Sequence, residues 1–121
     1  IKLTHMNIAL IGYGKMGKTI EQVAVSRGHH IKVKIDLNNL DDFNSANFNN
    51  IDVAIEFTGP HTAYNNLLKC IAMKIPVVCG STGWLEHLMD VEEKCTSEDG
   101  SFLYASNFSV GVNVFFEINK K

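Results

Sequence analysis

The sequence has 121 residues, of which 11 are basic and 13 acidic, so its formal net charge is −2. A chain of this length forms one domain with a sizeable core, and 45% hydrophobic with 20% charged residues is typical of a folded protein. The absence of a basic block argues against nucleic-acid binding, and no apolar run approaches the roughly 18 residues needed to cross a membrane. Three widely spaced cysteines indicate reduced thiols, so we expect a cytoplasmic protein.

Short apolar runs alternate with segments whose apolar residues recur at helical spacing, which predicts alternating strands and helices. The predicted strands cover residues 7–11, 31–36, 52–57, 76–79 and 102–105. Helices are predicted at 15–27, from Pro60 through Ile71, around 85–91, and after Gly111. Pro60 suits a first helical position because its missing N–H costs nothing there. Residues 37–50 contain six asparagines and predict a loop with at most a short helix.

This alternation predicts an α/β fold with a Rossmann-like, doubly wound parallel sheet in a single three-layer domain. Neighbouring parallel strands need a crossover connection, which a helix usually supplies. Ligands of such sheets bind beyond the carboxyl ends of the strands. The turns predicted at these ends are therefore the candidate site, and they cover residues 12–17, 58–59, 80–83 and 106–109.

Three glycines follow the first predicted strand and open the first predicted helix, with the spacing of a dinucleotide-binding turn. Gly12 permits the turn, Gly14 lets a pyrophosphate approach the backbone, and Gly17 allows the helix to pack closely on the strand. The start of the helix adds unpaired N–H groups that favour an anion. Asp36 ends the second predicted strand, where a carboxylate would bind the adenosine ribose.

The charge of Asp36 favours NADH over NADPH. At about 4 Å, a carboxylate repels a 2′-phosphate by roughly 1 kcal/mol per unit charge in water and about 4 kcal/mol at an effective dielectric constant of 20. Residues 37–39 carry no positive charge that would offset this repulsion. Lys15 in the glycine turn and Lys34 in the second strand could each turn toward a phosphate, so NADPH remains possible.

Four short stretches resemble the bacterial dihydrodipicolinate reductases, also called 4-hydroxy-tetrahydrodipicolinate reductases, of lysine and diaminopimelate biosynthesis. They are Gly-Lys-Met-Gly at 14–17, Phe-Thr-Gly-Pro at 57–60, Gly-Ser-Thr-Gly at 80–83 and Asn-Phe-Ser-Val-Gly-Val-Asn at 107–113. The last stretch is the most diagnostic, and the likeness extends over residues 6–121. Two features differ from the family pattern: the glycine turn is one residue shorter, and Lys15 replaces an arginine.

The resemblance implies an enzyme that transfers hydride from NADH or NADPH to a cyclic dihydrodipicolinate-type imine. In that family a Rossmann-like domain binds the cofactor and a second domain presents this small-molecule substrate. The full-length protein is expected to be a homotetramer. The implied cofactor contacts are Gly12, Tyr13, Gly14, Lys15, Met16, Gly17, Asp36, Thr58, Gly80, Ser81, Thr82, Ala105, Ser106, Asn107 and Phe108.

We expect residues 6–113 to form the nucleotide-binding domain and residues 114–121 to begin the connection to a substrate domain that lies outside this chain. Residues 1–5 are interpreted as a remnant of an expression tag. The family's catalytic lysine and its histidine-rich stretch belong to the second domain, so no catalytic residue is assigned here. The chain alone is predicted to bind the cofactor without turnover.

Two alternative functions share the glycine turn. One is a stand-alone NAD(H)-binding module that senses redox state for a partner, which would need a finished C-terminal surface. Phe115 and Phe116 argue against it, because they would leave apolar surface exposed in an unfinished helix. The other is a different nicotinamide-dependent dehydrogenase, such as a homoserine or semialdehyde dehydrogenase, which the stretch at 107–113 disfavours.

The remaining side chains of reactive type are interpreted as structural. Cys79 could be a thiol nucleophile, but a small buried strand residue is the favoured interpretation. Trp84 either packs in the core or flanks the cofactor pocket. The histidines lack metal-ligand spacing, and we expect His29 and His30 in a solvated turn and His61 and His87 on helix surfaces.

Overall fold

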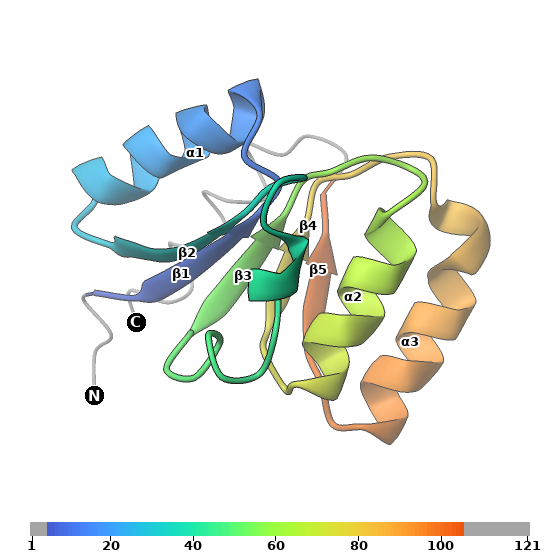
Figure 1. Ribbon diagram of the computed structural model, residues 1–121. Helices are drawn as coiled ribbons and strands as arrows, with labels where there is room; N and C mark the ends of the chain where they lie inside the picture. The colour runs from blue at the N-terminus through green and yellow to red at the C-terminus, as the bar shows by residue number, and fades with distance from the viewer. Residues whose placement is uncertain (1–4, 106–121) are drawn as a thin grey trace.

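The strands of the computed structural model, which describes residues 5–105, form a parallel five-stranded sheet (Figure 1). They are β1 (Asn7–Ile11), β2 (His30–Ile35), β3 (Val53–Glu56), β4 (Val77–Cys79) and β5 (Phe102–Tyr104). The helices are α1 (Lys15–Ser26), α2 (Ala63–Ala72) and α3 (Leu88–Ser97), with short 3-10 helices η1 (Leu40–Asp42) and η2 (Leu85–His87). The strand order β2-β1-β3-β4-β5 confirms the predicted doubly wound, Rossmann-like sheet.

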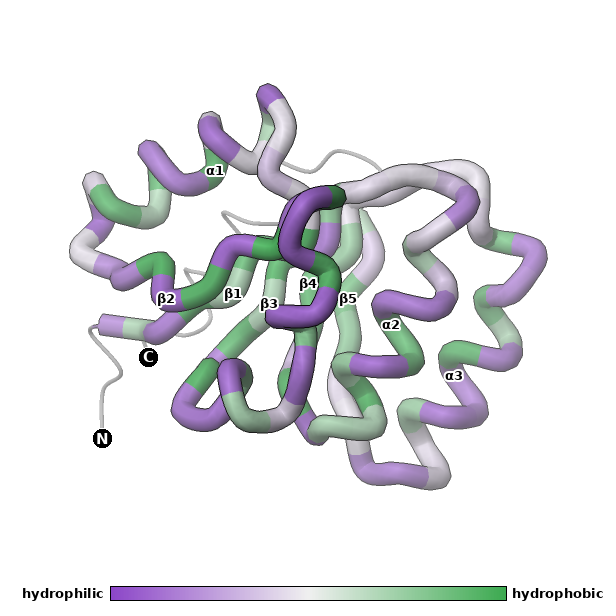
Figure 2. Tube along the Cα trace, in the orientation of Figure 1, coloured by the Kyte–Doolittle hydropathy of each residue, from purple (hydrophilic) through white to green (hydrophobic). Residues whose placement is uncertain are grey.

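Helices cover both faces of the sheet, with α1 on one face and α2 and α3 on the other (Figure 1). Successive residues of β1 point to opposite faces, as in any strand. Ile8 and Leu10 therefore pack in a core with α1, and Ala9 and Ile11 pack in a second core with α2 and α3. Strands β1, β3 and β4 are mostly hydrophobic, whereas β2 and the helices alternate hydrophobic and hydrophilic residues (Figure 2). This three-layer arrangement is the predicted one.

Helix α2 begins three residues later than predicted, at Ala63 rather than Pro60. Residues that precede a proline are disfavoured in the helical region, and Gly59 lies outside that region, with a positive φ of 155°. The Gly59 carbonyl then accepts hydrogen bonds from the Thr62 and Ala63 amides at 3.4 and 3.1 Å. Pro60 therefore belongs to a turn that faces the carboxyl ends of the strands, and the prediction of a helical position was wrong.

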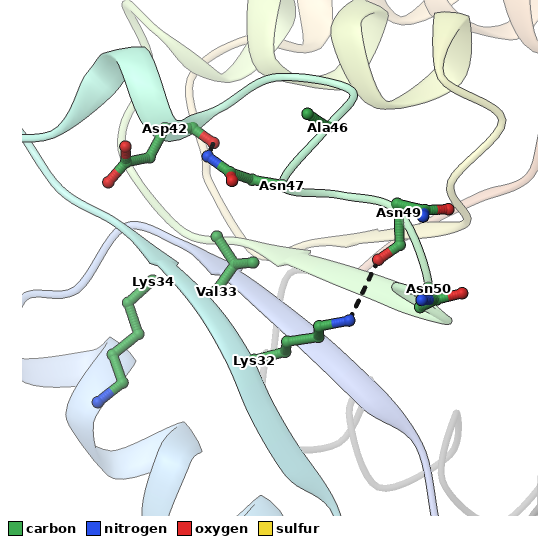
Figure 3. A pocket seen from close by; sticks show the side chains of 8 residues that line it. All are labelled: Lys32, Val33, Lys34, Asp42, Ala46, Asn47, Asn49 and Asn50. Atoms are coloured by element: carbon green, nitrogen blue, oxygen red, sulfur yellow. Dashed lines mark hydrogen bonds between the residues drawn. The ribbon is translucent and has the colours of Figure 1, made fainter.

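Residues 36–50 lie beside the edge strand β2 and pack on the sheet face that α2 and α3 also cover. Phe43 and Phe48 are buried and stacked, with ring centroids 5.0 Å apart, and they anchor this segment to the core. Figure 3 shows the polar hollow that remains between the segment and β2, with the Lys32 ammonium donating to the Asn49 carbonyl at 3.3 Å. The segment is thus a loop with the single 3-10 turn η1, as predicted.

Two further expectations concern residues that the structure describes, and a third concerns residues beyond them. His30 is exposed, as predicted, but it is the first residue of β2 rather than part of a turn, and the ring nitrogen Nδ1 of the half-buried His29 accepts a hydrogen bond from the Met6 amide at 3.1 Å. No helix within residues 5–105 has the length and apolar character of a membrane span. The predicted last helix and the stretch at 107–113, with Ser106, lie outside the described residues.

Candidate functional site

A pocket of about 610 Å³ opens at the carboxyl ends of β1, β2 and β3. The three segments that follow these strands form its walls. In a doubly wound sheet this is the point where the chain leaves β1 in one direction and β3 in the other, and ligands bind there. The lining residues are Ile11, Gly12, Tyr13, Gly14, Lys15, Met16, Gly17, Ile35, Asp36, Leu37, Leu40, Phe57, Thr58, Gly59, Pro60, His61, Thr62 and Asn66.

The glycine turn forms the floor of the pocket. The space around each of its three glycines differs, and it shows what a side chain at that position would meet. Gly12 has a φ of 104°, and a Cβ there would lie 2.2 Å from the Phe57 carbonyl oxygen. A Cβ on Gly17 would lie 2.5 Å from the Gly12 carbonyl oxygen. Gly14 differs, because a Cβ there would meet nothing within 4 Å, so its backbone faces open space. The turn is thus tight at two positions and accessible at the third, where helix α1 begins.

The β2 side of the pocket ends in an oriented carboxylate. Asp36 is exposed, and its Oδ1 accepts a hydrogen bond from the Leu37 amide at 2.9 Å. The Asp36 amide in turn donates to Asn39 Oδ1 at 2.6 Å, which fixes the backbone of this turn. Leu37 and Leu40 line the pocket beside the carboxylate, with 85% and 58% of their surfaces exposed. This end therefore combines a hydrogen-bond acceptor with apolar surface.

A charged cluster supports the glycine turn from the side of α1. The Lys34 ammonium lies 2.8 Å from Glu21 Oε2, and the Tyr13 hydroxyl donates to Glu21 Oε1 at 2.5 Å. Hydrogen bonds from Lys34 and then Tyr13 hold the pKa of Glu21 below its ordinary value. The same contact with Glu21 raises the pKa of Lys34. Lys34 points toward α1 rather than toward the loop beyond β2 (Figure 3), while Lys15 lies exposed in the pocket wall.

The β3 side of the pocket is built on a buried carboxylate, Glu56, whose exposed fraction is 0%. Its Oε1 accepts a hydrogen bond from the Ser81 hydroxyl at 2.6 Å. Its Oε2 accepts hydrogen bonds from Asn66 Nδ2 at 3.0 Å and from the Thr58 hydroxyl. Each of these donors compensates part of the cost of burying the charge. Thr58, which was predicted as a cofactor contact, lines the pocket directly.

The other predicted contacts on this side lie behind the wall or beside it. Ser81 is 3% exposed and uses its hydroxyl within the protein. Gly80, Thr82 and Ala105 follow the ends of β4 and β5 and are not among the residues that line the pocket. The remaining predicted contacts, Ser106, Asn107 and Phe108, lie outside the described residues. The structure therefore brings together the contacts predicted after β1, β2 and β3.

Two residues with alternative interpretations prove to be structural. Trp84 is fully buried, its indole N–H donates to the Ser81 carbonyl at 2.8 Å, and its ring meets Tyr104 edge-on. Cys79 is buried in β4, and burial followed by the charge of Glu56 raises the pKa of its thiol to about 12. A thiol with so high a pKa is a poor nucleophile near neutral pH. Trp84 therefore packs in the core, and Cys79 is a buried strand residue.

Several lining residues were missed in the sequence: Leu37, Leu40, Pro60, Thr62 and Asn66. His61 was expected on a helix surface, but it lies in the turn before α2 and lines the pocket. For all of these except Asn66 the available signal was position, because they lie in the segments that follow β2 and β3, whereas Asn66 lies within α2. Residues 5–105 contain no group of three or more His, Cys, Asp or Glu side chains that could hold a metal ion.

The family model described as "Dihydrodipicolinate reductase, N-terminus" matches residues 6–108 of this chain. The chain belongs to the dihydrodipicolinate reductase family. Two similar proteins are named 4-hydroxy-tetrahydrodipicolinate reductase. The one from Christiangramia forsetii is 51% identical over 118 residues, which cover 96% of this chain and 48% of that protein. The one from Bifidobacterium longum subsp. infantis is 30% identical over 111 residues, which cover 87% of this chain and 44% of that protein.

The chain therefore spans about half the length of these reductase relatives. The matched range includes every residue that lines the pocket, so the pocket belongs to the part of the chain that identifies the family. A solved homoserine dehydrogenase from Thiobacillus denitrificans is similar in fold, with a TM-score of 0.54 over 83% of this chain and 29% of its own. Its sequence identity of 16% supports the Rossmann-like fold alone.

Proposed function

We propose that this chain is the NAD(P)H-binding domain of a 4-hydroxy-tetrahydrodipicolinate reductase. The observation that carries the proposal is the glycine turn at the start of α1, whose backbone is open at Gly14 and closed at Gly12 and Gly17. A dinucleotide needs this arrangement, because its pyrophosphate must approach backbone N–H groups closely. The bound nucleotide would supply the hydride that reduces a cyclic dihydrodipicolinate-type imine.

The walls of the pocket favour one direction for the nucleotide. The pyrophosphate would accept hydrogen bonds from N–H groups at the start of α1, and the exposed Lys15 adds positive charge there. Asp36 on the β2 side would accept hydrogen bonds from the adenosine ribose, with Leu37 and Leu40 beside the adenine. Since β3 lies on the opposite side of β1, the nicotinamide half would extend along Thr58 and the turn that follows it.

We further propose that NADH binds more tightly than NADPH. A 2′-phosphate on the adenosine ribose would lie next to the Asp36 carboxylate and be repelled by it. Lys34 offers little compensation because its ammonium is paired with Glu21 at 2.8 Å. Lys15 belongs to the glycine turn, where the pyrophosphate would use its charge. The cofactor would therefore be NADH by preference, with NADPH as a weaker ligand.

The remaining parts of the proposal concern the protein as a whole. Residues 6–113 would form the nucleotide-binding domain, and residues 114–121 would lead toward a substrate domain, as the half-length match to the reductases supports. The substrate, a small dicarboxylate, would be bound by that second domain, and the complete protein would be a cytoplasmic homotetramer. The nucleotide-binding domain alone would then bind NADH without reducing the substrate.

Substitution of Gly14 tests this proposal directly. A side chain at this position meets no protein atom within 4 Å, so Gly14→Ala and Gly14→Val are expected to fold with unchanged thermal midpoints. Each added carbon would occupy the space of the pyrophosphate, so the Kd of NADH measured by calorimetry should rise at least tenfold for Val and less for Ala. Unchanged NADH affinity in folded Gly14→Val would refute the proposed site.

A further inference from the structure

The carboxylate of Glu56 connects three segments behind the pocket wall. Its donors come from the turn after β3, the turn after β4 and helix α2, through Thr58, Ser81 and Asn66 respectively. Burial of a charge is costly unless several hydrogen bonds compensate it, so a buried glutamate at this place constrains its neighbours strongly. Glu56 itself does not line the pocket, but two of the residues that it contacts, Thr58 and Asn66, do.

The hydrogen bonds around Glu56 have a fixed direction. Ser81 Oγ accepts hydrogen bonds from the Thr58 amide at 2.9 Å and the Gly59 amide at 3.1 Å, so its own hydrogen is left for Glu56 Oε1. The Asn66 NH₂ group can only donate, so Glu56 Oε2 is the acceptor in that contact. Both carboxylate oxygens therefore act as acceptors, which is the ordinary role of a carboxylate.

This direction is passed on to the pocket wall. The Thr58 hydroxyl uses its one hydrogen on Glu56, so the 2.6 Å contact between Thr58 Oγ1 and Thr62 Oγ1 must use the hydrogen of Thr62. Thr58 Oγ1 also lies 3.3 Å from Asn66 Nδ2, which donates to it. The oxygen of Thr62, which lines the pocket, is then left with lone pairs and no hydrogen to offer.

We propose that Glu56 is a positioning residue that, through Thr58, makes the pocket wall at Thr62 an acceptor of hydrogen bonds. Such a wall binds donors, and the nicotinamide half of NAD(P)H carries donors in its ribose hydroxyls and its carboxamide NH₂. It repels phosphate oxygens, which are acceptors like the wall itself. Glu56 thereby helps to set the direction of the dinucleotide across the glycine turn, and this inference rests on the proposed nucleotide-binding function.

The test compares NADH with ADP, which carries the adenosine and pyrophosphate but no nicotinamide half. Glu56→Gln keeps the size of the side chain but turns one acceptor into a donor, so either Ser81 or Asn66 would face a donor of like kind. Calorimetry should show the Kd of NADH rising about tenfold while that of ADP stays within twofold. Glu56→Asp keeps both acceptors and should restore the NADH-to-ADP ratio, and Glu92→Gln, exposed on α3, is the matched control.

The outcomes distinguish a positioning role of Glu56 from a merely structural role of this residue. They also distinguish failure of this inference from failure of the proposed nucleotide binding. Equal weakening of NADH and ADP in Glu56→Gln, or no weakening of either, overturns the inference. If Glu56→Gln does not fold, Thr62→Val removes the acceptor oxygen without touching the buried carboxylate, and an unchanged NADH affinity in that variant overturns it as well. If the unmodified chain binds neither NADH nor ADP, the proposed function fails, and the inference fails with it.

Discussion

The charge of Asp36 offers the most quantitative test of how this pocket selects its cofactor. Because Asp36 is exposed, its repulsion of a 2′-phosphate at about 4 Å is near the aqueous value of about 1 kcal/mol per unit charge. A phosphate monoester carries a charge of about −1.5 to −2, so the total is about 2 kcal/mol. Asp36→Asn removes the charge and keeps a polar side chain. Loss of the charged acceptor should weaken both nucleotides about threefold, while removal of about 2 kcal/mol of repulsion strengthens NADPH about thirtyfold. We therefore expect the affinity for NADPH to rise about tenfold and that for NADH to fall about threefold.

Titration calorimetry of both nucleotides at low salt measures this change. The preference of the unmodified chain for NADH should also shrink as salt is added, since exposed charges are screened within about 10 Å at 0.1 M ionic strength. Asp41→Asn is the matched control, because Asp41 is exposed in the neighbouring turn η1 and does not line the pocket. Equal affinities for NADH and NADPH in the unmodified chain, or an unchanged ratio in Asp36→Asn, would refute the electrostatic reasoning.

Three further predictions concern stability and reactivity. Gly17→Ala places a methyl group 2.5 Å from the Gly12 carbonyl oxygen, so urea unfolding should show a loss of about 1–3 kcal/mol, and an unchanged midpoint would contradict the close packing. Alkylation at pH 8 followed by mass spectrometry should label the partly exposed Cys95 before Cys79, whose pKa is raised to about 12; the reverse order would disprove the assigned burial. Burial lowers the pKa of His29, so the unfolded chain binds that proton first and stability should fall as the pH drops below about 6.5. Thermal midpoints measured over a range of pH should fall less for His29→Gln than for the unmodified chain. The same pH dependence in both proteins would contradict the assigned effect of His29.

The sheet was predictable because its signals are local and repeated. The apolar run at β1 is followed at once by glycines and an amphipathic segment, and the same order recurs at β3 and β4. The errors fall where tertiary contacts override local preference. Pro60 is acceptable in a first helical turn, but Thr58 and Thr62 bond to each other across this turn and α2 begins only at Ala63. Similarly, His29 follows a helix-ending glycine, yet its ring accepts a hydrogen bond from the Met6 amide.

The parts of the candidate site that depend on backbone sterics were the most predictable. The positions of Gly12, Gly14 and Gly17 depend on steric rules that the spacing already contains. Ser81 was chosen for its place after β4, but its hydroxyl turns inward to Glu56, and no local pattern distinguishes an inward from an outward serine. Asn66 was missed because it belongs to a helix, whose lining face depends on how α2 is set against the sheet.

Asp36 and Glu56 show why burial has to be known before an acidic residue can be given a role. Both lie at the carboxyl end of a strand beside β1, Glu56 as the last residue of β3 and Asp36 one residue after the end of β2. Asp36 follows an edge strand and is exposed, so its carboxylate can still accept donors from a ligand. Glu56 ends a central strand, where burial obliges it to take its donors from the protein. One carboxylate can therefore recognise a sugar directly, whereas the other can act on the ligand only through the hydroxyl groups that it orients.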